Sequence, residues 1–191
     1  GYSSTPYLAL GVAATVPALA VWLARSYAFG PVAAARAVET ATVVSAFALA
    51  AITHSLVRYE RPRIWIDLTA GIMPLEFPAA RIWLARIVSL PAVAFGAAAA
   101  AQAGIALGPG MAAELLWLWW ATASLTAAFC YEMAERTSAG LVLAFIAAAG
   151  DALLVVFNTP SDVMWYFGPF LYVYVLSNIV PRAGLKAAAR A

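Results

Sequence analysis

A few ionisable side chains lie inside long apolar runs, and these are the residues of this chain that could do chemistry. Asp151 is the deepest, because it stands several residues inside the run from Ser138 to Phe157. An ionised group in hydrocarbon costs at least about 2.5 kcal/mol even on insertion scales. The carboxyl group should therefore face protein or water. Two interpretations stay open: a polar patch on a substrate path, or a hydrogen bond that only packs two helices together.

Other acidic residues have basic neighbours at helical spacing. Glu39 follows Arg36 by three positions, and Glu132 precedes Arg136 by four. Residues three or four apart lie on one face of a helix. Both pairs are predicted to be ion pairs near helix ends. Glu114 opens another apolar run, where an acidic group favours a helix N-terminus.

Metal or haem chemistry is not predicted. His54 is the only histidine, and the only cysteine, Cys130, lies inside an apolar run. A zinc site needs a set of Cys and His ligands, and haem held by two imidazoles needs a second histidine. We therefore expect His54 to be an ordinary residue near a helix end and Cys130 to make no internal disulfide.

Aromatic residues gather in two of the apolar runs, at Trp117, Trp119, Trp120, Trp165, Tyr166, Phe167, Tyr172 and Tyr174. Trp and Tyr near the ends of spans usually anchor a helix at the membrane interface. The alternative is the lining of a path for a flat apolar substrate. On that alternative, Asp151, Trp120 and Tyr172 are the candidate path residues.

The elements that carry these residues are predicted to be membrane-spanning helices. The chain is 65% hydrophobic and only 10% charged, against about 25% charged residues in a soluble domain. No run shows the alternation of a membrane β-barrel. We predict an all-α integral membrane protein, with residues 1–191 forming a single transmembrane domain. Its six spans are placed at Tyr7–Ala24, Ala37–Val57, Ala85–Leu107, Met111–Met133, Ser138–Phe157 and Val163–Val180.

The basic residues predict the orientation. Nine of the eleven Lys and Arg residues fall on one side of the expected spans, and only Arg25 and Arg36 fall on the other. Short loops rich in Lys and Arg stay in the cytoplasm. Both termini are therefore expected in the cytoplasm, with the chain in the lipid bilayer of a bacterial-type inner or plasma membrane. The net charge of +2 reflects these loops and does not indicate nucleic-acid binding.

The connection at about residues 58–86 is more than a simple bundle needs. The stretch from Ile64 to Pro78 is apolar, but Gly71, Pro74 and Pro78 make it too short and too interrupted to span. It predicts a short interfacial helix, a proline turn at Pro74–Pro78 and a second short helix, Ala79 to Arg86, that leads into the third span. An anchor that only fixes helix tilt is the alternative.

The run from Arg58 to Arg86 resembles the connection after the second span in membrane subunits of type-2 ABC exporters, including the haem-exporter subunit. That family has an acidic residue, an apolar helix, a proline next to an apolar residue, a short turn, and an apolar helix ending in a basic residue. The matching positions are Glu60, Ile64 to Met73, Pro74-Leu75, Glu76 to Pro78 and Leu84-Ala85-Arg86. A weaker similarity covers Ser124 to Thr126 and Tyr131 to Gly140.

The resemblance implies a permease whose loop docks on a separate ATPase subunit. The residues implied in coupling are Glu60, Pro74, Leu75, Glu76, Phe77 and Pro78. Replacing Leu75 and Phe77 by Asp is expected to uncouple the partner without unfolding the bundle. ATP and Mg²⁺ would bind to that P-loop ATPase, which agrees with the absence of a Gly-x-x-x-x-Gly-Lys-Ser/Thr loop from this sequence. This chain would be no enzyme, would hold no cofactor, and would pair with a second copy or a paralogue.

Two other functions stay open. A non-catalytic structural subunit of a larger membrane complex would show the same small-residue helices. A secondary transporter usually has broken helices, and Pro17 and Pro91 interrupt two of the predicted spans. The substrate is not specified, because lipids, peptides, drugs and haem all suit these residue types.

Overall fold

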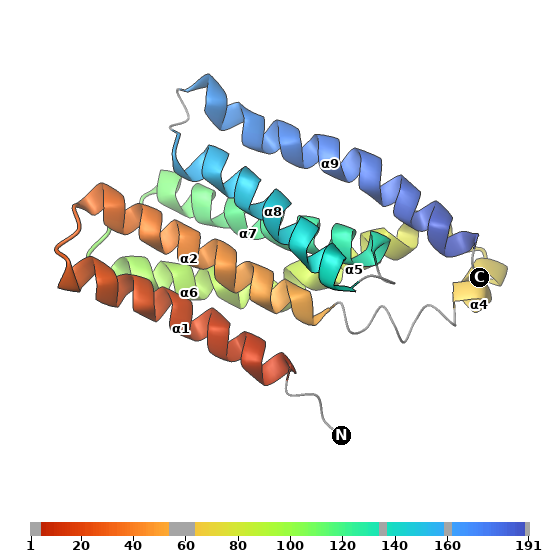
Figure 1. Cartoon of the computed structure of the whole chain (residues 1–191), viewed down its shortest axis with the longest axis horizontal. Coiled ribbons are helices and arrows are strands. Elements are labelled where there is room, and N and C mark those ends of the chain that lie inside the picture. Colours follow the sequence, from red (N-terminus) through yellow and green to blue (C-terminus); the bar gives the residue numbers. More distant parts are fainter. Residues whose placement is uncertain (1–4, 54–63, 134–136, 159–161, 190–191) are drawn as a thin grey trace.

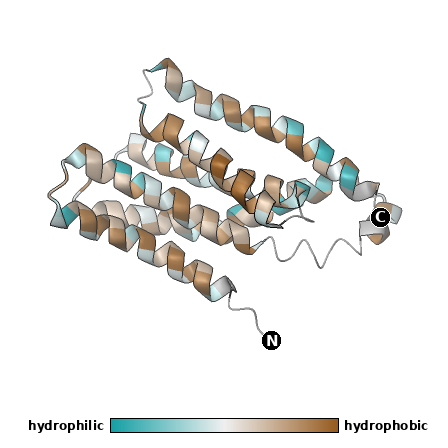
Figure 2. Cartoon of the chain, in the orientation of Figure 1, coloured by the Kyte–Doolittle hydropathy of each residue, from teal (hydrophilic) through white to brown (hydrophobic). Residues whose placement is uncertain are grey.

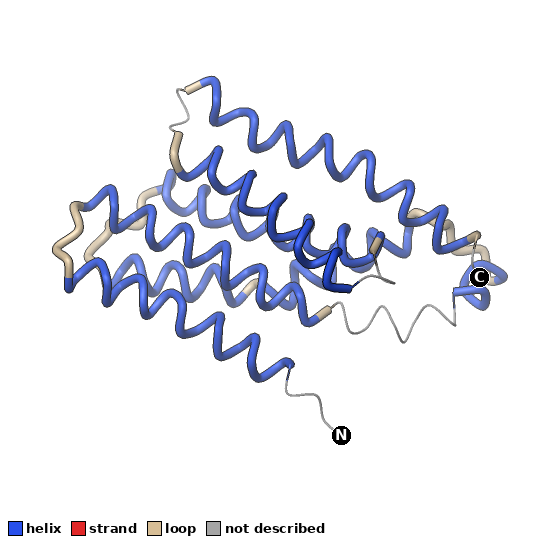
Figure 3. The backbone as a smooth tube through the Cα atoms, viewed as in Figure 1, coloured by secondary structure: helices blue, strands red, loops and turns tan. Residues whose placement is uncertain are grey.

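The described part of the protein is a bundle of helices. The computed structural model describes residues 5–53, 64–133, 137–158 and 162–189, which form eight α-helices and no strand (Figures 1 and 3). The helices are α1 (Thr5–Ser26), α2 (Pro31–Ile52), α4 (Ile64–Thr69), α5 (Glu76–Ser89), α6 (Pro91–Gln102), α7 (Pro109–Glu132), α8 (Thr137–Val156) and α9 (Val163–Ala188).

The long helices run from one end of the bundle to the other. The turns from α1 to α2 and from α6 to α7 lie at one end, and α4 lies at the opposite end (Figure 1). We call these the turn end and the α4 end. At the turn end, α2 and α7 each begin with a proline that follows an extended glycine, Gly30 or Gly108. Proline suits a first helical turn, because its missing N–H has no partner there.

Five stretches of helix are long and apolar enough to cross a membrane, within the residues that the structure describes. They are Tyr7–Ser26, Pro31–Ile52, Glu76–Gln102, Ser138–Val156 and Val163–Lys186. Figure 2 shows long hydrophobic stretches along these helices, most densely on α1 and α8. The prediction of an all-helical protein with several helices suited to a membrane is confirmed at this level.

The helix α7 was predicted as a span and forms over almost the same residues, but it is not among those five. It is the central helix, in contact with α2, α5, α6, α8 and α9. Its middle, from Ala121 to Ala128, is buried and includes Thr122, Ser124 and Thr126. Neighbouring helices cover these hydroxyls, so α7 carries them without exposing them to lipid.

Two predicted spans have wrong boundaries. The second span was predicted to begin at Ala37, whereas α2 begins at Pro31 and carries Arg36 in its second turn; its predicted end, Val57, lies outside the described residues. The third was predicted at Ala85–Leu107, whereas α5 and α6 together cover Glu76–Gln102 with a junction at Leu90. Pro91 is tolerated because it stands in the first turn of α6.

The first and fifth spans form within two residues of their predicted bounds, whereas three other elements differ in length. The sixth span was predicted to end at Val180, whereas α9 continues to Ala188 through Pro181. The interfacial helix was predicted over Ile64 to Met73 and is the six-residue α4, Ile64–Thr69. The proline turn is confirmed at Pro74, although the next helix begins at Glu76 and includes Pro78 in its first turn.

Small residues let the helices approach closely. Ser45 of α2 donates a hydrogen bond to the Ala13 carbonyl of α1 at 3.0 Å. Gly96 of α6 faces Thr42 of α2 so closely that a Cβ at Gly96 would overlap the Thr42 hydroxyl. Close packing of this kind is the main source of helix association in a bilayer.

We expect Gly96→Ala to destabilise the bundle by about 1–3 kcal/mol, because overpacking forces neighbours apart. The double variant Gly96→Ala, Thr42→Ala should recover most of the loss, since it removes the overlapping hydroxyl. Thermal unfolding in mild detergent measures both. Gly11→Ala is the matched control, because nothing lies within 4 Å of that position; an equal loss there would contradict the packing argument.

Candidate functional site

The site is built around Arg86, which lies inside the bundle. It is on the buried face of α5, together with Pro78, Ile82, Ala85 and Ser89, and is only 8% exposed. In the predicted arrangement, Arg86 is the basic residue that ends a short helix of the cytoplasmic loop, Ala79 to Arg86. That placement is wrong, because α5 begins at Glu76 and continues directly into α6. At 1.5 Å per residue, Arg86 stands about 15 Å along the axis from Glu76.

Hydroxyl groups from two other helices hold the guanidinium. Arg86 Nε donates to Ser124 Oγ of α7 at 2.9 Å, and its Nη2 donates to the Tyr172 hydroxyl of α9 at 3.0 Å. Trp120 Nε1 donates to the same Tyr172 oxygen at 3.0 Å. Ser124 Oγ in turn donates to the Trp120 carbonyl at 2.6 Å. Hydrogen bonds therefore join α5, α7 and α9 at one point.

Two indole rings cover the guanidinium. Its Cζ lies 3.4 Å from the ring centroid of Trp120 and 4.8 Å from that of Trp83. The two indoles meet edge to face, with centroids 5.5 Å apart. The electron-rich face of an indole attracts a cation, by about 2 kcal/mol or more when water is excluded. The rings therefore offset part of the cost of burying the charge.

No carboxylate compensates Arg86 within the described residues. The ion pairs there join Arg36 to Glu39 and Glu114, and Lys186 to Glu132. A buried charge without an opposite charge is strongly unfavourable, and an arginine cannot become neutral. The site is thus a net positive group held only by neutral hydroxyls and aromatic rings.

Asp151 of α8 lies nearby, at the contact of α8 with α9. It is 1% exposed, and its Oδ1 makes no hydrogen bond. A Cβ at Gly168 of α9 would lie 3.2 Å from this oxygen. The indole of Trp117 interacts with the carboxyl group, although its Nε1 does not reach hydrogen-bond geometry. The carboxyl group therefore faces protein, as predicted, with unused hydrogen-bonding capacity.

Arg86 and Asp151 belong to one polar seam. Gly168, against Asp151, and Tyr172, against Arg86, lie one turn apart on the same face of α9, or about 6 Å. The Trp117 and Tyr172 rings meet edge to face at 5.3 Å. We use the name polar seam for Arg86, Trp117, Trp120, Ser124, Asp151 and Tyr172. It follows the α7–α9 contact and reaches α5 and α8 at its sides.

The three predicted path residues are brought together only in part. Trp120 and Tyr172 share a hydrogen bond, and Asp151 lies about one turn away. The sequence analysis missed Arg86 and Ser124, which hold the centre of the seam. Pro78, Ile82 and Arg86 follow one another at intervals of four residues, which places all three on one face of a helix. This spacing is the signal that could have found Arg86.

The predicted coupling residues surround the turn between α4 and α5. Met73 N–H donates to Glu76 Oε2 at 3.0 Å, so the Glu76 side chain holds the turn. Pro74 packs so closely on α9 that a Cβ at Gly184 would overlap its carbonyl oxygen. Leu75 is 49% exposed. Glu60 lies outside the described residues.

Two of these residues face inward. Phe77 packs with Leu68 of α4 against Tyr131 and Ala183, and Pro78 is buried. Replacing Phe77 by Asp would therefore disturb packing between α5, α7 and α9. The expectation that this substitution leaves the bundle intact does not suit the structure, whereas Leu75 remains a suitable position.

The predicted ion pairs have a mixed outcome. Arg36 and Glu39 pair at 2.8 Å, as predicted, and Arg36 also lies 3.7 Å from Glu114. Glu132 pairs instead with Lys186 of α9 at 2.9 Å, while its predicted partner, Arg136, lies outside the described residues. The Glu132 pair ties α7 to α9 at the α4 end.

Metal-ligating side chains do not cluster in the described ranges: no group of three or more His, Cys, Asp or Glu residues gathers there. Cys130 is buried and free. His54 lies outside the described residues.

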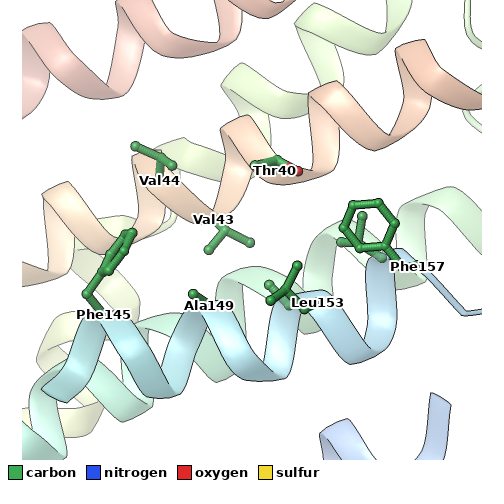
Figure 4. A pocket seen from close by; sticks show the side chains of 9 residues that line it. Thr40, Val43, Val44, Phe145, Ala149, Leu153 and Phe157 are labelled. Carbon is green, nitrogen blue, oxygen red and sulfur yellow. The ribbon is translucent and has the colours of Figure 1, made fainter. Parts of the chain in front are cut away.

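A groove of about 150 Å³ lies between α2 and α8 (Figure 4). Phe145, Ala149, Leu153 and other apolar side chains line it. Its one polar side chain, Thr40, already donates to the Arg36 carbonyl at 2.8 Å. The groove offers apolar contact but no free polar group, so the polar seam is the better functional candidate.

Comparison with known proteins gives no match: no family model, no curated protein and no solved structure matches this chain.

We expect Tyr172→Phe to destabilise the protein by about 1–3 kcal/mol, because Arg86 and Trp120 both lose an acceptor in a buried site. Thermal unfolding in detergent measures the change. Tyr174→Phe is the matched control on the same helix, because Tyr174 is exposed. Equal stability of the two variants would show that the seam contributes little.

Proposed function

We propose that this chain is the membrane subunit of a type-2 ABC exporter that couples to a separate ATPase. The observation that carries the proposal is the course of α5. This helix begins at the exposed turn around Pro74 and brings Arg86 into the polar seam. One rigid element of 14 residues thus connects a surface suited to docking with a polar site in the bundle.

The docking surface would be the exposed apolar part of the α4 end. It consists of Ile66, Ile72, Met73 and Leu75, of which Met73 is 67% exposed. Contiguous apolar groups at the surface mark interaction sites. The turn is also supported from behind by α9, through Gly184 and Ala183. A partner that pushed on this turn would therefore move α5 and α9 together.

The topology that this function requires has six spans, with α7 as the central one, and both termini in the cytoplasm. Arg81, Arg182 and Lys186 lie toward the α4 end, and Arg25 and Arg36 lie at the turn end. With the further basic residues in the connections, the α4 end would be cytoplasmic. ATP and Mg²⁺ would bind to the partner ATPase, and two membrane subunits would enclose the path.

A non-catalytic subunit of a larger membrane complex is the second candidate. The exposure of α9 favours this candidate, because only 6% of the residues in the apolar stretch of α9 are buried within the chain. Its outer face carries Tyr166, Phe170 and Tyr174, all exposed. Another subunit could cover this face in either function, so the partner that copurifies decides between them.

We expect a P-loop ATPase to copurify with the wild-type chain in mild detergent, and Leu75→Asp to reduce its recovery at least about tenfold. A buried carboxylate without a partner would oppose the contact. Quantitative mass spectrometry and ATPase assays measure the outcome. Leu107→Asp is the matched control, because Leu107 is similarly exposed but lies in the turn before α7.

Two results would contradict the exporter proposal. One is copurification of other membrane subunits without any ATPase, which would favour the structural-subunit alternative. The other is full recovery of the ATPase with Leu75→Asp, which would place its docking site elsewhere.

The orientation is tested with single cysteines in a Cys130→Ser background. We expect a membrane-impermeant maleimide to label Leu107→Cys in intact cells, and to label Met73→Cys only after the membrane is opened. Both positions are exposed and lie at opposite ends of the bundle. The reverse pattern, or labelling of both sites in intact cells, would refute the proposed topology.

A further inference from the structure

We propose that Arg86 is a binding site for an oxyanion, such as the phosphate group of an anionic lipid or a free phosphate ion. The inference rests on the unbalanced charge inside the polar seam and on the donors that the protein leaves unused. It does not depend on the exporter proposal, because a structural subunit with the same bundle would carry the same site.

The first step of the argument is charge. The Arg86 guanidinium remains positive under all ordinary conditions. Its contacts from α7 and α9 are hydroxyls and indoles, and no carboxylate pairs with it among the described residues. Asp151 does not take this role, since its Oδ1 lies against Gly168 without a hydrogen-bond partner and no ion pair joins it to Arg86. An anion bound at Arg86 would remove the largest unfavourable electrostatic contribution in the seam.

The second step is geometry. A guanidinium has five N–H donors in a planar fork. Nε donates to Ser124 and Nη2 donates to Tyr172. Nη1 makes no hydrogen bond to a described residue. Cζ lies 3.4 Å from the Trp120 centroid and 4.8 Å from the Trp83 centroid, and the two centroids are 5.5 Å apart, so the rings cover adjacent sides of the guanidinium. An additional ligand would meet an edge that points away from both rings. Two oxygens of a phosphate or carboxylate match such an edge.

The third step is access. Trp83, which covers one side of the guanidinium, is 56% exposed on the outer face of α5. Arg86 itself retains a small exposed fraction. A shift of the Trp83 ring would therefore open the site to the lipid side of the bundle. The headgroup of an anionic amphiphile could enter there with its chains outside.

The test uses the full chain in dodecylmaltoside and measures thermal unfolding with three additions: dioleoylphosphatidylglycerol, dioleoylphosphatidylcholine, and inorganic phosphate against chloride at equal ionic strength. At about ten times the dissociation constant, a ligand of the native state should raise Tm by about 3–5 °C. We expect this rise with phosphatidylglycerol, phosphate or both, and not with phosphatidylcholine or chloride. A rise with the lipid alone assigns the site to a headgroup; a rise with phosphate assigns it to a free anion.

The variants identify the residue responsible. Arg86→Gln should lose at least half of the anion-dependent rise, and Arg182→Gln, which removes an exposed charge near the end of α9, should keep it. If Arg86→Gln does not fold, Tyr172→Phe decides: it keeps the charge but removes one acceptor, so its rise should exceed that of the wild type. Equal rises in wild type and Arg86→Gln, an unchanged or smaller rise in Tyr172→Phe, or no anion effect at all would overturn the proposal.

Discussion

The arrangement of this bundle follows from one permanent charge placed where water is scarce. Arg86 cannot lose its proton, so its neighbours must supply acceptors and polarisable surface. Ser124 and Trp120 of α7 and Tyr172 of α9 supply them. α5, α7 and α9 all contribute to the contacts of the buried Arg86 charge. These hydrogen bonds therefore couple the positions of the three helices more tightly than apolar packing alone would.

The same charge makes α5 more than a connection between two spans. Its first turn is held by Glu76 and packs on α9, and its fourth turn ends at the junction with α6, at Leu90 and Pro91. The junction interrupts the backbone ladder, so α5 can tilt with less effect on α6. A movement of the Pro74 turn would then displace Arg86, which lies between the two ends of α5, before it displaced α6.

The lengths of the apolar runs predicted that helices would form and roughly where. In lipid the backbone N–H and C=O groups must be hydrogen-bonded within the protein, and a helix achieves this within one segment. The prediction placed the start of the third span at Ala85 instead of Glu76, because Arg86 was taken to end the loop and its charge was assumed to require exposure. The position of Arg86 depends on hydroxyls 38 and 86 residues away, which no local pattern contains. The contact of Lys186 with Glu132 was missed for the same reason, since α9 was expected to end before it.

The one long helix of the described residues that is not among the five apolar membrane-crossing stretches is also the one that the others surround. In water the interior of a bundle is its most apolar part, whereas in lipid the surface can be as apolar as the core. Polar side chains then gain most where other helices cover them, and Thr122, Ser124 and Thr126 of α7 occupy such a position. A search for spans by hydropathy alone passes over this helix. Ser124 belongs to this covered part of α7 and accepts a hydrogen bond from Arg86, the charge that α5 brings inward.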